Sequence, residues 1–134
     1  MTWALVRALL LGITMVAVYF AWTTLSQTGS GGSVCEVPIV VEVLNGCGVG
    51  GTARGVGEIL IDQGCDVMFV GNADDFDHRE TLVVDRSGDR SKARAVASVL
   101  PGSGVIYQVG SAFFVDVTVV IGSDLAGSLP HGAE

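Results

Sequence analysis

Residues 40–73 read VVEVLNGCGVGGTARGVGEILIDQGCDVMFVGNA, and this stretch predicts one strand–helix–strand unit. The unit begins inside the β-branched run Ile39–Leu44, which is typical of a buried strand. Thr52–Gln63 then spaces its apolar residues as one helical face, and Gly64 stands where a helix often ends in a left-handed residue. Val67–Val70 is the next expected strand, parallel to the first because a helix connects the two.

The alternation of strands and helices continues beyond this unit. A second helix is expected to begin with Asp89 or Ser91 as its cap and to end before Pro101. The predicted order β-α-β-β-α-β-β indicates an α/β (α+β) fold with a small mixed sheet and helices packed on it. Three further apolar runs are the remaining expected strands: Thr81–Asp85, Val105–Val109 and Val115–Ile121.

An uncharged apolar run precedes the domain. Ala8–Leu25 has 18 residues without a charge. As a helix it would be about 27 Å long, close to the ~30 Å hydrocarbon core of a bilayer. Trp3 and Trp22 lie near its ends, where indole rings favour the membrane–water boundary. We therefore expect a transmembrane anchor over residues 1–25, in contact with lipid through residues 3–25. A cleaved signal peptide and a buried soluble helix are the alternatives, although no small-residue cleavage site follows the run.

One charge sets the expected orientation. Arg7 precedes the apolar run, and no Lys or Arg follows until Arg54. The positive-inside rule then places the N-terminus in the cytoplasm and the rest of the chain on the extracytoplasmic side of a single-pass cytoplasmic membrane protein. The Gly- and Ser-rich residues 26–35 are expected to be a flexible linker, residues 36–125 one domain, and residues 126–134 a C-terminal tail.

The charge balance excludes one class of partner. The chain has 7 Lys and Arg against 14 Asp and Glu, a net charge of −7. Such an acidic protein is not expected to bind nucleic acid or an anionic lipid surface broadly. A small cluster of basic residues lies near the second expected helix. It could bind an acidic partner or polymer. The alternative is that neighbouring aspartates neutralise it. Its members are Arg86, Arg90, Lys92 and Arg94.

Metal and catalytic sites are not expected. His78 and His131 are the only histidines, and no cysteine or carboxylate completes a metal-ligand spacing around them. Both are interpreted as surface histidines. Asp74, Asp75 and Asp77 lack the Asp-x-Asp-x-Asp-Gly pattern of a calcium loop and are interpreted as a solvated acidic turn. The serines lack a plausible His/Asp partnership, so no catalytic residue is assigned.

The glycine loop is the sharpest candidate site. Gly46, Gly48 and Gly51 spell G-x-G-x-x-G between a strand and a helix, as dinucleotide-binding loops do. The domain is too short for a full Rossmann sheet and its expected compartment holds little NAD, so no nucleotide cofactor is expected. With Asn45 and Thr52, the loop remains a candidate for another anion, such as a polymer phosphate or a partner carboxylate. The simpler interpretation is that Asn45 and Gly46 form a tight turn and that the glycines let strand and helix approach closely. Thr52 is also the candidate N-cap of the helix that follows.

Several phrases recur in the order of a known family. Val41, Val43 and Leu44-Asn45-Gly46 are followed by Gly48, Gly51, Gly64 and Gly71-Asn72-Ala73, and later by DHRETLVVDRSGD and DVTVVIGSDL. Over about residues 38–125 this sequence resembles the LytR C-terminal domain family, although Cys65 stands where the family often has an aromatic. The resemblance implies a non-catalytic module of the bacterial cell envelope that binds cell-wall polymer or envelope-assembly proteins. The alternative is a single-span accessory subunit of a larger membrane complex.

The cysteines carry a topological prediction. Cys35 and Cys65 precede the first and second strands, so parallel strands would place both at one end of the sheet, with Cys47 at the other. A Cys35–Cys65 disulfide is therefore feasible, leaving Cys47 free or in an intermolecular contact. Three reduced thiols are the alternative.

Overall fold

The computed structural model describes residues 2–25, 32–110 and 114–129 of the 134-residue chain. It divides into two compact units, Met1–Gly31 and Gly32–Glu134. The expected linker lies largely on residues 26–31, and most of the expected tail on residues 130–134, outside the described residues.

The first unit is the helix α1 (Thr2–Leu25). Its window Thr2–Tyr19 has a mean hydropathy of 1.7, and every side chain there is exposed. Within the described ranges it is the one helix long and apolar enough to cross a membrane. An N-terminal signal sequence has the same properties.

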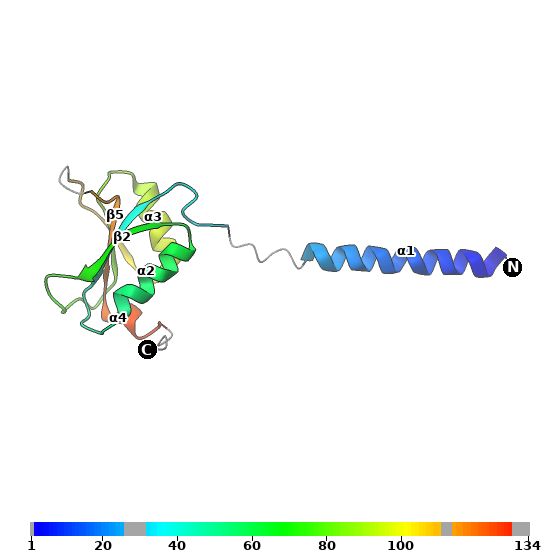
Figure 1. Cartoon of the computed structure of the whole chain (residues 1–134), viewed down its shortest axis with the longest axis horizontal. Helices are drawn as coiled ribbons and strands as arrows, with labels where there is room; N and C mark the ends of the chain where they lie inside the picture. The colour runs from blue at the N-terminus through cyan, green and yellow to red at the C-terminus, as the bar shows by residue number, and fades with distance from the viewer. Residues whose placement is uncertain (1, 26–31, 111–113, 130–134) are drawn as a thin grey trace. The chain divides into compact units, whose positions relative to one another are not determined.

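The second unit confirms the predicted order of strands and helices and adds a short final helix. Each expected strand and helix is present, with ends shifted by a few residues (Figure 1). The elements are β1 (Val40–Asn45), α2 (Thr52–Asp62), β2 (Asp66–Asn72), β3 (Leu82–Asp85), α3 (Arg90–Val99), β4 (Gly104–Tyr107), β5 (Val117–Ile121) and α4 (Ser123–Ala126).

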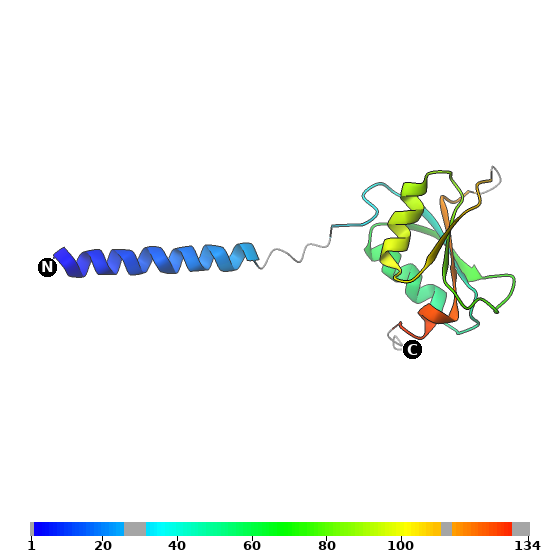
Figure 2. The same cartoon turned by 180° about the vertical axis from the view of Figure 1, so that it is seen from behind.

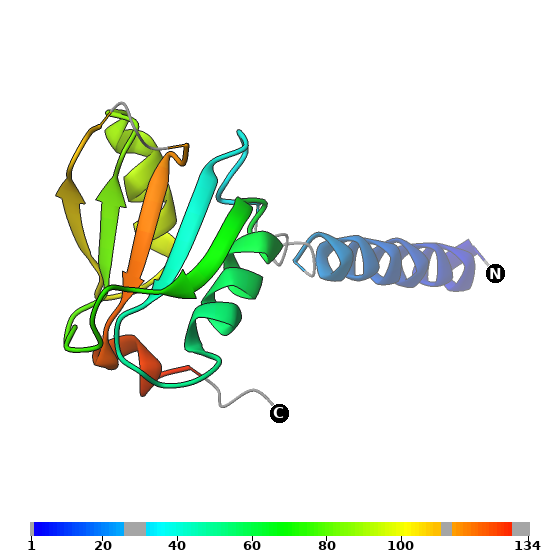
Figure 3. The same cartoon turned by 60° about the vertical axis from the view of Figure 1, so that its left-hand side comes forward.

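The strands form one mixed sheet in the order β2-β1-β5-β3-β4. β1 lies parallel to β2, as predicted, and also parallel to β5. β3 is parallel to β4 but antiparallel to β5. The last strand of the sequence is therefore the central strand of the sheet (Figure 3).

Both long helices of this unit cover the same face of the sheet. α2 packs on β1 and β2, α3 packs on β3 and β4, and the two helices contact each other (Figure 2). Alternate residues of the strands point into the layer between them, as the two-residue period of a strand requires. The core is built from fully or nearly fully buried side chains, among them Val41, Val43, Val56, Leu60, Val83, Val96, Val117, Val119 and Ile121.

The helix ends correct one prediction. The expected N-cap Thr52 is wrong: α2 is capped by Gly51, whose φ of 82° is left-handed, and Thr52 is the first helical residue. The Thr52 hydroxyl donates instead to the Val49 carbonyl at 2.8 Å, so it tightens the preceding turn. At the other end of α2, Gly64 has the expected left-handed backbone, with a φ of 83°. Of the two candidates for α3, Asp89 is the cap; its carboxylate accepts from the Ser91 amide at 3.0 Å.

Candidate functional site

The structure brings the predicted loop residues together where β1 ends and α2 begins. Asn45 and Thr52 both donate to the Val49 carbonyl, at 2.8 Å each. The loop therefore closes through its own side chains at the end of the sheet opposite the start of β1. The residues concerned are Asn45, Gly46, Gly48, Gly51 and Thr52.

The Asn45 amide organises this turn from inside. The side chain is buried, and its Oδ1 accepts hydrogen bonds from the amides of Cys47 and Gly48, both at 3.1 Å. Its Nδ2 donates to the Val49 carbonyl on the far side of the turn. One asparagine thus satisfies three backbone groups of the loop, which explains why a short polar side chain ends an otherwise apolar strand.

Two distant segments converge on Gly46. Its N–H donates to the Ile121 carbonyl at 2.9 Å, and its carbonyl accepts from the His78 amide at 3.0 Å. A Cβ at this position would lie 2.7 Å from His78 Cδ2 and 2.9 Å from the Ile121 oxygen. Gly46 is therefore required by close packing against β5 and the β2–β3 connection.

The hydrogen bonds of the loop amides weigh against anion binding at this loop. The amides of Gly46, Cys47 and Gly48, which a dinucleotide-type loop would present to phosphate, already donate to protein oxygens. The segment carrying Asp74, Asp75 and Asp77 runs beside the loop, since Ala73 donates to the Asn45 carbonyl at 2.9 Å. Nearby carboxylates repel an anion. Anion binding by this loop stays a prediction, and the packing role of the loop is the better supported one.

Most of this domain matches one protein-family model. The family model described as LytR cell envelope-related transcriptional attenuator matches residues 38–125. The chain belongs to the LytR C-terminal domain family. The family description is cell envelope-related and names no catalysed reaction. Searches of the curated proteins and of the solved structures find no match.

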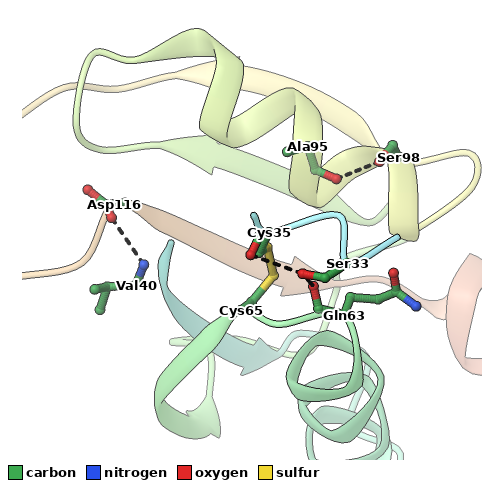
Figure 4. The surroundings of a disulfide bond; sticks show 8 residues. All are labelled: Ser33, Cys35, Val40, Gln63, Cys65, Ala95, Ser98 and Asp116. Atoms are coloured by element: carbon green, nitrogen blue, oxygen red, sulfur yellow. Dashed lines mark hydrogen bonds between the residues drawn. A yellow bond between two sulfur atoms is a disulfide. The ribbon is translucent and has the colours of Figure 1, made fainter. Parts of the chain in front are cut away.

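In this LytR C-terminal domain a disulfide holds the segment that leads into β1. Cys35 and Cys65 are buried and bonded to each other, with their Cα atoms 5.1 Å apart (Figure 4). The Cys35 amide also donates to the Gln63 carbonyl at 3.0 Å. Cys47 is a free, half-buried thiol at the opposite end, with its Sγ 3.2 Å from Asn45 Oδ1.

A second polar group at the loop end was missed by the sequence interpretation. Asp124 accepts from the Thr81 hydroxyl at 2.7 Å and from the Thr81 amide at 3.1 Å, while the Thr81 hydroxyl accepts from the Gly122 amide at 3.0 Å. Partial burial raises the pKa of Asp124, but the bonds from Thr81 outweigh it and leave the pKa below its ordinary value. This group joins β3 to α4, and the only sequence signal was Asp124 in the first turn of a helix too short to predict.

The predicted basic cluster does not form one patch. Arg86 donates through Nε to the Thr118 hydroxyl at 3.2 Å. Arg90 stacks over the Tyr107 ring at 4.4 Å, and Lys92 donates to Asp116 at 2.8 Å. The fourth member, Arg94, is exposed. Three of the four side chains, Arg86, Arg90 and Lys92, therefore serve separate contacts within the domain.

Asp116 links the start of the sheet to α3. Its carboxylate accepts from Lys92 and, at 3.0 Å, from the Val40 amide of β1 (Figure 4). Burial raises the pKa of Asp116, but the hydrogen bonds from Lys92 and Val40 outweigh that effect, and the pKa lies below its ordinary value.

The structure describes one of the two histidines, His78. His78 is half-buried with its ring over Gly46, and its Nε2 lies 3.3 Å from Asp75. It therefore lies at the surface and packs partly into the loop, while His131 lies outside the described residues. In the part of the chain that the structure describes, no group of three His, Cys, Asp or Glu side chains could hold a metal.

Proposed function

We propose that this chain is a single-span protein of the cytoplasmic membrane whose LytR C-terminal domain acts outside the cytoplasm as a non-catalytic interaction module of the cell envelope. The observation that carries the proposal is the combination of an envelope-family domain with a preceding apolar helix. The residues Thr2–Tyr19 are all exposed in the described part of the chain. An apolar surface of that extent needs cover, and lipid supplies it.

Two further features support the location. α1 has 24 residues, which at about 1.5 Å per residue is enough to cross a bilayer with some tilt. The Cys35–Cys65 bond is of the kind that persists in oxidising compartments outside the cytoplasm.

The non-catalytic part of the proposal rests on the contacts of the reactive side chains. Among the described residues, His78 contacts Asp75 and Gly46, and no serine or cysteine side chain donates to it. Cys47 is near Asn45 and Thr52, neither of which is a general base. The domain thus supports binding better than nucleophilic chemistry.

The anchor is tested by membrane extraction. The tagged full chain is expected to stay in the membrane pellet at alkaline pH. Ile13→Arg, at the middle of α1, costs on the order of 3 kcal/mol of insertion free energy and is expected to release the chain. Glu58→Arg, on the exposed surface of α2, is the matched control and should stay in the pellet. Equal release of the parent chain and of Ile13→Arg would contradict the anchor.

Orientation has its own readout. Protease added to intact spheroplasts is expected to remove a C-terminal tag without lysis. A tag that is cut only after lysis places the domain in the cytoplasm and overturns the proposal.

The proposed module could bind either wall polymer or envelope proteins, and two experiments distinguish these partners. Retention of the detergent-solubilised chain on insoluble peptidoglycan supports binding of wall polymer. Co-migration with integral membrane proteins supports binding to envelope-assembly proteins, or an accessory role in a larger complex.

A further inference from the structure

One face of the sheet has no covering layer in the described chain. Figure 3 looks onto this face, with α2 and α3 behind the sheet. Sheets rich in parallel pairs are normally covered on both faces, since their strands carry apolar residues on both. We name this surface the open face. Its apolar side chains come from all five strands: Phe69, Leu44, Val120, Leu82, Val84 and Ile106. Of these, Val84 is itself buried within the chain, at 3% exposed.

The register arranges these residues in rows across the sheet. Leu44 of β1 pairs with Val120 of β5, and Val120 pairs with Leu82 of β3. At the sheet edges, Phe69 of β2 is 52% exposed and Ile106 of β4 is 41% exposed. One row across the three middle strands is thus apolar, and exposed large side chains lie on both sides of it.

A polar row crosses the same face. Arg86 donates to the Thr118 hydroxyl at 3.2 Å, and Thr118 donates to Glu42 at 3.0 Å. Thr118 belongs to the central strand, so the acid and the base lie on opposite sides of the middle of the sheet. The open face therefore carries an acid and a base about its centre, Glu42 and Arg86, and both are joined to Thr118 within the chain.

We propose that the open face binds the open face of a second copy of this chain, about a two-fold axis parallel to the strands and above β5. That axis stacks β5 on β5, β1 on β3 and β2 on β4 of the partner. It places Leu44 over Leu82, Phe69 over Ile106, and Glu42 over β3, which Arg86 directly follows, each pair from different copies. A self-complementary patch is what a two-fold interface requires.

The axis is also consistent with the side from which the chain reaches the sheet. A rotation about the strand direction keeps both copies of β1 pointing the same way, so both Cys35 residues lie at the same end of the sandwich. Both chains can then reach one membrane. A two-fold axis across the strands would instead put the two Cys35 residues at opposite ends of the sandwich. The choice between these two axes rests on the proposed function, in which each chain is anchored in one membrane.

The size of the surface makes the association weak in solution. Five strands spaced about 4.8 Å apart present a face on the order of 400 Å², so two copies bury about 800 Å², below the ~1,200 Å² of standard interfaces. Anchors in one membrane raise the effective concentration of the two domains and compensate for a small interface. The dimer is therefore expected in the membrane, and the experiment uses the full chain there.

Crosslinking in the membrane tests the axis. In a Cys47→Ser background, Val120→Cys brings the two introduced thiols together at the axis, and a short bis-maleimide is expected to join two chains. Glu58→Cys, exposed on α2, is the control and is expected to stay monomeric. Equal crosslinking of the two variants overturns the proposal. So does crosslinking of Val120→Cys to another protein, because the face then has a different occupant.

A charge exchange tests the pairing of Glu42 with Arg86 between two copies that each remain folded. Glu42→Arg alone, or Arg86→Glu alone, puts like charges opposite each other in the homodimer, and either is expected to reduce the crosslinked product roughly tenfold. Co-expression of the two variants with different tags pairs opposite charges at both positions and is expected to restore mixed dimers. Contacts within one chain cannot produce that rescue, so its absence contradicts the interface. Release of the chain in alkaline extraction contradicts the anchor instead, which keeps the two failures distinct.

Discussion

The two ends of the sheet are held by different chemistry. At the disulfide end, where β1 starts, a covalent bond joins Cys35 to Cys65 and the Asp116 carboxylate holds the start of β1. At the loop end, where β1 finishes, the structure shows the buried Asn45 amide, the Thr81–Asp124 pair and backbones in close contact. The comparison indicates that the end at which the chain reaches the sheet depends on a crosslink, whereas the loop end depends on residues that fit closely.

Removing the crosslink is expected to have the largest effect. The bridged residues are 30 positions apart, and replacing both by alanine (Cys35→Ala with Cys65→Ala) should lower the free energy of unfolding by about 3–4 kcal/mol. Pulse proteolysis of the full chain in urea measures it. Cys47→Ala, at the loop end, is the control and should cost less than about 1 kcal/mol. Similar losses for both variants would remove the distinction between the ends.

Gly122→Ala is the matching test at the loop end. Its Cβ would collide with the Glu80 carbonyl carbon and lie 2.7 Å from the Glu80 nitrogen, and a backbone cannot rotate away. We expect a loss of about 2–3 kcal/mol from overpacking, measured by the same proteolysis. Gly50→Ala, with nothing within 4 Å of its Cβ, should change stability by less than about 0.5 kcal/mol. A neutral Gly122→Ala would show that this end tolerates movement.

Asn45→Ala sharpens the comparison further. It leaves the amides of Cys47 and Gly48 and the Val49 carbonyl without their side-chain partner, at a cost of about 2 kcal/mol. Asn45→Asp keeps the acceptor and loses the donor, so urea unfolding should place it between the parent and the alanine variant. Asn72→Ala, exposed at the end of β2, is the control. An aspartate variant less stable than the alanine one would contradict this role of the amide.

Lowering the pH is expected to have the smallest effect on stability and to weaken both ends of the sheet. The pKa values of Asp116 and Asp124 lie below the ordinary value in the folded state. A lowered pKa means that the ionised carboxylate stabilises the fold above about pH 4, and that this contribution is lost as the pH falls through the folded-state pKa. Urea midpoints between about pH 6 and about pH 2 should therefore fall less steeply for Asp116→Asn or Asp124→Asn than for the parent. Parallel curves would show that neither group contributes.

Local patterns predicted most of the elements and part of the site. The β-branched runs indicated the strands, Gly64 and Asp89 bounded helices, and the order of the cysteines along a parallel unit led to the Cys35–Cys65 pairing that the structure contains. The N-cap at Thr52 was wrong because the left-handed Gly51 turns the chain into α2 one residue earlier. The turn at Asn45 was predicted, because its partners are at most four residues away. The role of Asp124 was not predictable, since its partner Thr81 is 43 residues away in the sequence.

The sequence by itself determined the kinds of element, their order and the apolar character of α1, because these follow from the spacing of apolar residues along a local segment. Only the tertiary structure decided that β5 lies in the centre of the sheet, that β3 runs antiparallel to it, and that both helices cover one face. Those choices depend on which distant surfaces bury each other. For the same physical reason the open face is invisible in the sequence: a residue such as Leu44 looks like any core leucine until the strand order shows that no helix in the described chain lies over it.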